Sequence, residues 1–437
     1  MDDMIEQIIV DFRERSFPII RPRLEQELPW IEGKIDTVIG IRRAGKTYFV
    51  YQMLQNHLIN KDVSKDKILY INFEDERLLP LTAKDLHKIP DIFYRLYPEH
   101  KNTKCYFVFD EIQNIEGWDK FVRRLLDTEN VHIILTGSSA KLLSKEIATA
   151  LRGRTISTEI FPYSFKEAIS YENPSLNINT SFKPGSKTRA FINNRIRQYL
   201  LRGGFPEVLD LDQEYRTRIL QGYVDVVTLR DVIERYQISN IQALRALIRT
   251  LLTSPASLFS VNKFYNDLKS QGLSCTKNDL YNFLEYLADA YLVYPISIFN
   301  RSERIQRTNP KKIYIVDNGL ITAFSHDPHS DWGKHLENFV FLNLRRQNLT
   351  IEYYRTAHNA EVDFITTSSD GQRMLYQVAL NLNDQKTRSR EIQALEQAMQ
   401  ELKLKKSILI TLEHRETILI DSGTIEVLPV AEWTLYH

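Results

Sequence analysis

The sequence predicts an α/β protein of several domains. Between about residues 30 and 165, short apolar runs alternate with helical patterns. From about 190 to 300 the pattern is helical, and beyond about 310 strand-like apolar runs return. Buried strands separated by helical crossovers indicate a mostly parallel sheet covered on both faces. A chain of 437 residues has room for about two to four domains.

The chain is close to electrical neutrality, with 57 Lys and Arg residues against 56 Asp and Glu residues. Any affinity for nucleic acid must therefore come from local basic patches. Cys105 and Cys275 form neither a CxxC pair nor a zinc-ligand spacing, which favours a reducing, cytoplasmic setting. No run approaches the roughly 18 apolar residues of a membrane helix, and the N-terminus does not resemble a signal peptide, so we expect a cytoplasmic protein without a membrane partner.

Four apolar runs in the first part of the chain have the length and composition of buried strands. They are "DTVIGI" (36–41), "KILYINF" (67–73), "CYFVFD" (105–110) and "VHIILTG" (131–137). Polar stretches at 171–187 and 300–312 are rich in Pro, Asn, Ser and Gly or in charge, and these composition changes predict connectors between domains.

The stretch "GIRRAGKT" (40–47) follows the first apolar run and precedes a helical pattern, which is the setting that a phosphate-binding loop requires. Backbone amides and the helix N-terminus would hold phosphate, Lys46 would reach the β and γ oxygens, and Thr47 would hold Mg²⁺. The other residues expected to contact the nucleotide here are Gly40, Arg42, Arg43, Ala44, Gly45 and Tyr48.

Asp110 and Glu111 end the third apolar run, "CYFVFDEIQ". After a phosphate-binding loop, the first carboxylate of such a pair is expected to hold Mg²⁺ and the second to polarise the attacking water. The cofactors that this pattern predicts are ATP and Mg²⁺.

The fourth run ends in hydroxyl side chains, and Thr136 or Ser138 is placed to sense the γ-phosphate. Capping of the next helix by Ser138 or Ser139 is an equal alternative. Arg152 and Arg154 follow, and we favour Arg154 over Arg152 as an arginine that reaches across a subunit boundary, with a surface ion pair as the alternative. This role predicts a homo-oligomer.

The turn "GGFPE" (203–207) combines two glycines with a proline between helices. Gly204 and Pro206 could form a rigid turn against a bound base, although helix termination explains the same residues nearly as well.

Taken together, the motifs resemble those of archaeal and bacterial AAA+ family ATPases that join a P-loop domain to a C-terminal domain of poorly defined function. The motifs are "GIRRAGKT", "FVFDEIQ", "LTGSSAKLL", "LRGR" with "FPYSF", "GGFPEVL", "KIYIVDNGL" and "HLENFVFLNL" with "AEVDFI". The resemblance implies an AAA+ core related to the origin-recognition and signal-transducing ATPases (1–170), a helical lid (188–238), a winged helix (239–309) and a restriction-endonuclease-like domain (310–437). It also places the G-x-P residues Gly204 and Pro206 by the nucleotide.

The middle of the chain has helix-turn-helix spacing, because two amphipathic segments with Ser260 and Thr276 as caps are separated by "GLSC". The loop that follows is basic and could contact DNA phosphates, or could be a solvated charge run. Its candidate contacts are Arg301, Arg304, Arg307, Lys311 and Lys312. Acidic residues on the second helix disfavour groove reading, so packing between subunits is a further possibility.

The resemblance to restriction-endonuclease-like domains implies a metal site made of a helix glutamate, a strand aspartate, and a glutamate and lysine two apart on the next strand. Glu337 and Asp363 fit the first two places, but Gln377 and Ala379 stand in the last two. Gln377 carries no charge and Ala379 no cation, so we expect a degenerate site without Mg²⁺-dependent cleavage.

These patterns predict an oligomeric, Mg²⁺-dependent ATPase that acts on DNA, with Glu111, Lys46 and Arg154 as its catalytic residues. Two other functions remain open. The chain could be a nucleotide-gated switch for protein assembly without DNA, or an active metal-dependent DNA nuclease.

Overall fold

The computed structural model describes residues 1–437 except 139–150, 152, 175, 177–184, 328–330 and 437. The chain forms two compact units, Met1–Phe161 with Asp289–Tyr291, and Pro162–Ala288 with Leu292–His437. Among the described residues, every helix is too short or too polar to cross a lipid bilayer.

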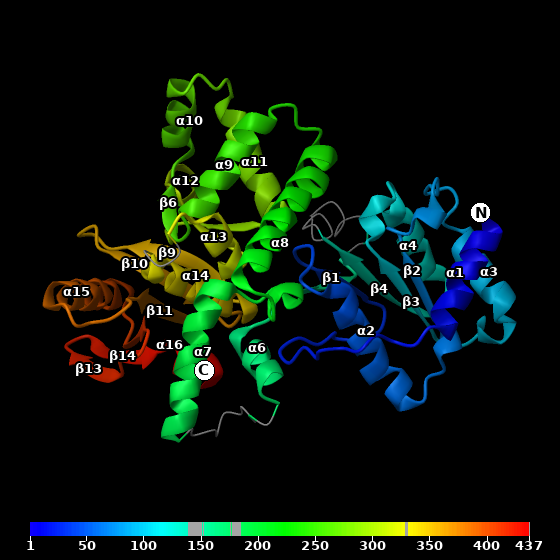
Figure 1. Cartoon of the computed structure of the whole chain (residues 1–437), viewed down its shortest axis with the longest axis horizontal. Helices are drawn as coiled ribbons and strands as arrows, with labels where there is room; N and C mark the ends of the chain where they lie inside the picture. The colour runs from blue at the N-terminus through cyan, green and yellow to red at the C-terminus, as the bar shows by residue number, and fades with distance from the viewer. Residues whose placement is uncertain (139–150, 152, 175, 177–184, 328–330, 437) are drawn as a thin grey trace. The chain divides into compact units, whose positions relative to one another are not determined.

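The first unit is built on a five-stranded parallel sheet in the order β2-β3-β4-β1-β5, and Figure 1 shows β1 to β4 side by side. The strands are β1 (Ile35–Ile39), β2 (Ile68–Asn72), β3 (Cys105–Asp110), β4 (Val131–Gly137) and β5 (Thr155–Glu159). The four predicted strands are confirmed. Sequence patterns missed β5, "TISTE", because this edge strand is half-exposed and has hydroxyl residues in place of an apolar run.

In the first unit, one described α-helix precedes the strands and the others lie between them in sequence. They are α1 (Asp2–Glu14), α2 (Lys46–His57), α3 (Lys88–Leu96) and α4 (Trp118–Thr128). Helix α1 buries Ile5, Ile8, Ile9 and Phe12 along one face, at the spacing of an amphipathic helix, and packs against α3 and β2.

The second unit begins with helices, as the pattern from 190 to 300 predicted. They are α6 (Phe165–Glu172), α7 (Ser186–Arg202), α8 (Gln213–Val226), a π-helix (Val227–Glu234), α9 (Ile241–Thr253), α10 (Val261–Ser270) and α11 (Lys277–Asp289). The two predicted caps are confirmed, since Ser260 accepts from the Lys263 amide at 3.4 Å and Thr276 accepts from the Asp279 amide at 3.1 Å.

A three-stranded antiparallel sheet follows in the order β6-β8-β7, made of β6 (Ser257–Phe259), β7 (Val293–Ile296) and β8 (Lys311–Ile315). The run "KIYIVD" was assigned to the C-terminal domain, but it forms β8 and pairs with β6 and β7, so this sheet spans the predicted boundary at residue 310. The basic stretch 300–312 is also not a loop throughout, because α12 (Glu303–Thr308) and the start of β8 lie in it.

The rest of the second unit surrounds a six-stranded sheet in the order β13-β14-β12-β11-β10-β9. Its strands are β9 (Thr350–Arg355), β10 (Glu361–Thr367), β11 (Arg373–Val378), β12 (Lys406–Thr411), β13 (Glu416–Ile420) and β14 (Gly423–Pro429). Its helices are α13 (Asn318–Phe324), α14 (Trp332–Arg346), α15 (Gln385–Leu402) and α16 (Val430–Tyr436). Strand β13 was missed, and it is an edge strand whose Leu419 is 81% exposed.

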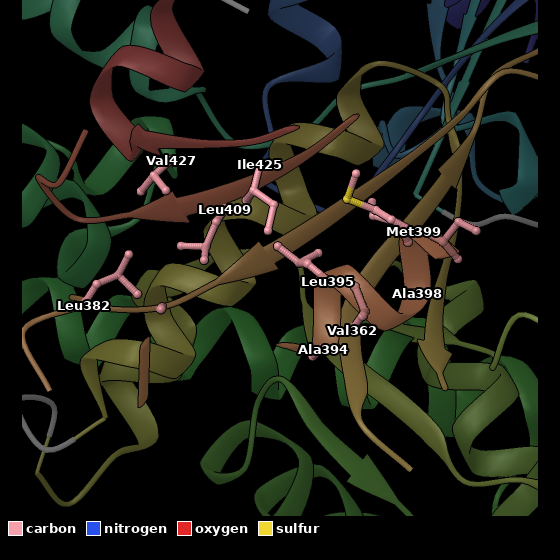
Figure 2. Close-up of a cluster of buried hydrophobic side chains, with 12 residues drawn as sticks. Val362, Leu382, Ala394, Leu395, Ala398, Met399, Leu409, Ile425 and Val427 are labelled. Atoms are coloured by element: carbon pink, nitrogen blue, oxygen red, sulfur yellow. The ribbon is translucent and has the colours of Figure 1, made fainter. Parts of the chain in front are cut away.

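Apolar side chains of α15 fill one face of this sheet. Figure 2 shows Leu395, Ala398 and Met399 of the helix together with side chains of the strands. Val362, Leu409 and other strand residues in this cluster are almost completely buried. Burial of this kind is the main stabilising contribution in folding, so this cluster holds α15 against the sheet.

The turn after α7 depends on the absence of side chains at Gly203 and Gly204. The Gly204 amide donates to Asp317 Oδ2 at 2.7 Å, and its carbonyl accepts from the Tyr163 amide at 2.7 Å. A Cβ at Gly204 would lie 2.0 Å from the Tyr163 oxygen, and one at Gly203 would lie 1.8 Å from Asp317 Oδ1.

We therefore expect Gly204→Ala to lower the free energy of unfolding by about 3 kcal/mol, because backbone must move to admit the methyl group. Thermal unfolding should shift downward by roughly 6 °C or more. Gly222→Ala is the matched control. Gly222 lies within α8 with open space around its Cβ position, so this change should be neutral or stabilising. An altered affinity for ATP with unchanged unfolding of Gly204→Ala would instead favour the nucleotide role.

Candidate active site

The loop between β1 and α2 has the backbone shape of a phosphate-binding loop. Gly40, Arg43 and Gly45 have positive φ angles of 135°, 66° and 97°, which turn the chain sharply before the helix begins at Lys46. Gly40 also packs against the backbone, because a Cβ there would lie 2.2 Å from the Ile160 oxygen. The loop therefore presents its amides in front of the N-terminus of α2.

Lys46 is buried inside this loop. Its Nζ donates to the carbonyls of Gly40 at 3.1 Å and Ile41 at 3.3 Å, and it lies 3.5 Å from Glu111 Oε1. The loop lysine and the second carboxylate of the acidic pair thus meet at the same end of the parallel sheet.

Asp110 accepts hydrogen bonds from three hydroxyl groups. Thr47 Oγ1 and Tyr70 Oη reach Oδ2 at 2.9 and 2.5 Å, and Thr136 reaches Oδ1. Burial raises the pKa of Asp110, and the hydroxyl donors oppose that shift. The oxygen atoms of Thr47 and Asp110 are the ligand type that Mg²⁺ prefers, so these residues fit the ion that the resemblance implies.

Glu111 stands in a left-handed backbone conformation, with a φ of 53°, directly after β3. Burial would raise its pKa, but Lys46, Gln113 and Arg42 together hold the pKa of Glu111 below its ordinary value. Gln113 Nε2 donates to Oε2 at 2.5 Å. The side chain is thus held as an ionised carboxylate beside Lys46, in the state that a water-orienting base requires.

Thr136 joins the two acidic residues, because its Oγ1 accepts from the Glu111 amide at 3.0 Å and donates to Asp110. The predicted sensor segment thus meets the acidic pair at Thr136. Ser138 is buried nearby in sequence, whereas Ser139 lies outside the described residues.

Sequence patterns missed two residues at this site, Arg23 and Tyr70. The buried Arg23 guanidinium donates to the carbonyls of Ala44 and Phe161, and Gln52 bonds to the Arg23 backbone at 2.7 and 3.0 Å. Arg23 precedes every recognised motif, and Tyr70 is recognisable only from the pairing of β2 with β3.

We expect Tyr70→Phe to raise the Mg²⁺ concentration for half-maximal ATPase activity by about tenfold, since it removes one hydrogen bond to a charged group. Loss of a donor also raises the pKa of Asp110 further, so the acid limb of the pH–rate profile should move to higher pH. Tyr106→Phe, on the neighbouring strand, is the control. Unchanged Mg²⁺ dependence and pH profile would show that Tyr70 contributes only packing.

The remaining nucleotide-site candidates come from several segments of the chain. Arg42 pairs with Glu74 at 2.7 Å, while Arg43 and Tyr48 are exposed. Arg154 pairs with Asp127 at 2.5 Å, which is the surface ion pair weighed as the alternative, and Arg152 lies outside the described residues. Gly204 and Pro206 belong to the second unit, whereas the phosphate-binding loop belongs to the first.

One predicted DNA contact, Lys312, is wrong, and a second, Lys311, is engaged within the protein. Lys312 is 3% exposed and its Nζ lies 2.8 Å from Glu337, 3.0 Å from Glu361 and 2.8 Å from Asp363. Lys311 is half-buried and its Nζ donates to Ser297 Oγ at 2.7 Å and to the Gln306 carbonyl at 2.9 Å. The basic stretch 300–312 was predicted to be a loop, but Lys311 and Lys312 lie on strand β8.

Arg301, Arg304 and Arg307 remain exposed at the start of this stretch, where Arg307 pairs with Glu303 at 3.0 Å. Exposed ion pairs of this kind contribute little to stability, so the three guanidinium groups are accessible to a partner.

Glu337, Glu361 and Asp363 form an acidic cluster around Lys312 Nζ. The structure thus brings Glu337 and Asp363 together, as the resemblance implied. Tyr314 donates to Glu337 Oε1 at 2.7 Å, and burial, with a contribution from Asp363, raises the pKa of Glu337 to about 7. Burial opposes the charge on Lys312, yet the carboxylates around it hold the pKa of Lys312 well above its ordinary value. The expectation that Ala379 leaves this region without a cation is therefore wrong.

The side chain of Gln377 makes two buried hydrogen bonds within the second unit. Its Oε1 accepts from the Asp363 amide at 3.1 Å, and its Nε2 donates to Glu391 Oε2 at 2.6 Å. The Val378 amide donates to Asp363 Oδ2 at 2.9 Å. The glutamine thus links β10, β11 and α15 through buried hydrogen bonds.

Asn318 and Asn338 form a second buried network that sequence patterns missed. Asn338 exchanges two hydrogen bonds with the Ile315 backbone, at 2.7 and 2.9 Å, and donates to Asn318 Oδ1 at 2.8 Å. Asn318 donates to the Leu200 and His335 carbonyls. The "VDNG" and "LENF" motifs therefore join α7, β8, α13 and α14.

Comparison with family models assigns three successive regions. A family model described as AAA domain matches residues 32–169. Two domains of unknown function follow, DUF8612 at 193–331 and DUF4143 at 332–433. The first match includes the phosphate-binding loop and the acidic pair, so the first unit contains an AAA domain with a P-loop.

Two relatives that match over almost their whole length are described as uncharacterized proteins. The uncharacterized protein MJ1544 of Methanocaldococcus jannaschii is 37% identical over 99% of this chain and 96% of its own length. An uncharacterized protein of Haemophilus influenzae is 30% identical over 92% of this chain and 94% of its length.

Among solved structures, the Walker-type ATPase PABY2304 of Pyrococcus abyssi is similar, with a TM-score of 0.42 and 16% identity over 66% of this chain and 90% of that one. The Aeropyrum pernix ORC1 protein in complex with DNA has a TM-score of 0.29 and 12% identity over 75% and 92% of the two chains.

Proposed function

Because the chain belongs to the same family as the uncharacterized protein MJ1544 of Methanocaldococcus jannaschii and contains an AAA domain, we propose that it is an Mg²⁺-dependent ATPase that couples ATP hydrolysis to conformational change on DNA. The convergence of Lys46, Thr47, Asp110 and Glu111 at one end of a parallel sheet carries this proposal.

In the proposed reaction, water attacks the γ-phosphorus of ATP, the bond from this phosphorus to the β–γ bridging oxygen breaks, and ADP and inorganic phosphate leave. Glu111, held ionised beside Lys46, orients that water and accepts hydrogen bonds from it. Lys46 offsets charge that develops on the transferred group, and the loop amides bind the phosphates. Thr47 and Asp110 would hold Mg²⁺, which when bound neutralises charge on the triphosphate oxygens.

Two further parts of the proposal concern partners. We assign Arg154 to the γ-phosphate of a neighbouring subunit in a homo-oligomer, which requires exchange of its Asp127 partner. We assign Arg301, Arg304 and Arg307 to DNA phosphates, supported by their exposure and by the element order β6-α10-α11-β7-α12-β8, which is that of a winged helix with α12 inserted between its last two strands. The element order α14-β9-β10-β11-α15-β12 supports a restriction-endonuclease-like scaffold.

The test is the ATPase rate with linear duplex, single-stranded and four-way DNA, together with DNA binding across a salt series in the presence of nucleotide. We expect stimulation by at least one DNA and a salt slope that falls by about one for each arginine removed among the three. Arg218→Ala, at an exposed arginine of α8, is the control. Nucleotide-dependent oligomerisation without DNA binding would replace this proposal with the assembly switch, and Mg²⁺-dependent cutting that Asp363→Ala abolishes would replace it with the nuclease.

A further inference from the structure

The acidic cluster of the second unit surrounds the ammonium group of Lys312, where a metal site would hold a divalent cation. Glu337 on α14 and Glu361 and Asp363 on β10 each direct a carboxylate oxygen at one atom, the Nζ of Lys312. An ammonium group has three N–H donors, and Lys312 Nζ donates to Glu361 Oε1 at 3.0 Å and to Asp363 Oδ1 at 2.8 Å. Its ion pair with Glu337 Oε1, at 2.8 Å, brings a third carboxylate against the ammonium.

Two of the other carboxylate oxygens of the cluster also contact protein groups. Asp363 Oδ2 accepts from the Val378 amide at 2.9 Å, and Glu361 Oε2 lies 3.4 Å from Arg355 Nη2. Glu337 Oε1, which pairs with Lys312, also accepts from Tyr314 Oη at 2.7 Å. Mg²⁺ needs oxygen atoms at about 2.0–2.1 Å in octahedral geometry, and it would have to enter beside a fixed positive charge.

Lys312 cannot leave this position by a simple side-chain rotation. It lies on β8, the middle strand of the β6-β8-β7 sheet, and its side chain is 4% exposed. Withdrawal of the ammonium would leave three carboxylates facing one another, two of them largely shielded from solvent, which is strongly unfavourable.

We propose that the Lys312 ammonium takes the place of a divalent cation in this cluster, so that the C-terminal domain binds no metal and uses the cluster to join β8 to α14 and β10. The Mg²⁺ of the restriction-endonuclease-like family does not fit here. This inference concerns a different unit from the P-loop and stands independently of the ATPase proposal.

The test compares thermal unfolding and Mn²⁺ binding of the full chain without nucleotide, in EDTA and in excess Mn²⁺. The wild type should bind no Mn²⁺ at this cluster. The temperature at which its second unit unfolds should be the same in EDTA and in Mn²⁺. Lys312→Ala should unfold several degrees lower in EDTA, and Mn²⁺ should restore about 4 °C or more, because an ion that binds only the folded state stabilises it.

Three further variants complete the design. Lys312→Ala combined with Asp363→Asn should regain part of the lost stability in EDTA and lose the response to Mn²⁺. Lys311→Ala, at the neighbouring residue of the same strand, should show no response. Lys312→Gln serves the same test if the alanine variant does not fold in either buffer.

The comparison of the wild type with Asp363→Asn decides the question directly. Mn²⁺ binding by the wild type that is lost in Asp363→Asn would overturn the proposal, as would Lys312 variants that fold but do not respond to Mn²⁺.

Discussion

Replacement of Glu111 by Gln is expected to lower the turnover number for ATP hydrolysis by at least about a hundredfold while ATP still binds, because the amide cannot accept a proton from the attacking water. The change keeps the shape of the side chain and removes its charge beside Lys46, whose Nζ lies 3.5 Å from Oε1. The measurement is steady-state phosphate release together with equilibrium binding of a fluorescent ATP analogue.

Glu116→Gln is the matched control, since Glu116 is an exposed carboxylate a few residues downstream and should leave turnover unchanged. Hydrolysis by Glu111→Gln at the wild-type rate would remove the water-orienting role. Loss of both binding and turnover would instead show that the Lys46–Glu111 pair holds the loop in shape, which is a structural role.

The first unit was largely predictable because its signals are local. The loop "GIRRAGKT" and the strand ending in Asp110 and Glu111 are continuous in sequence, and parallel strands bring their carboxyl ends to one edge of a sheet. Tyr70 was missed because its role depends on which strand pairs with β3. Nothing in the apolar run "KILYINF" distinguishes a hydroxyl that reaches Asp110 from one that merely packs.

The prediction that Lys312 contacts DNA failed for a different reason. A basic stretch usually indicates a solvated surface, and that interpretation fails where distant segments supply opposite charges. Lys311 and Lys312 are neighbours on a strand, so their side chains point to opposite faces. One reaches Ser297 and the other reaches carboxylates from α14 and β10, which no pattern within 300–312 could reveal.

Gln377→Glu, the change that would rebuild the carboxylate of a nuclease site, is expected to destabilise the protein and not to restore cutting. Gln377 is 5% exposed and its Nε2 donates to Glu391 Oε2 at 2.6 Å. A glutamate there would place two buried carboxylates against each other, a cost of about 3–5 kcal/mol. Thermal or urea-induced unfolding of the second unit measures this loss.

The charge-swapped variant Gln377→Glu with Glu391→Gln provides the decisive comparison. It re-creates one amide and one carboxylate across the same contact, so it should recover most of the stability lost in the single variant, with a coupling free energy of about 1–3 kcal/mol in a double-mutant cycle. Additive losses would contradict a direct role for the Gln377–Glu391 hydrogen bond. If Gln377→Glu with Ala379→Lys were stable and cut DNA with Mg²⁺, Gln377 would be a lost metal ligand. The hydrogen bonds to Asp363 and Glu391 argue instead that the glutamine belongs to the present fold.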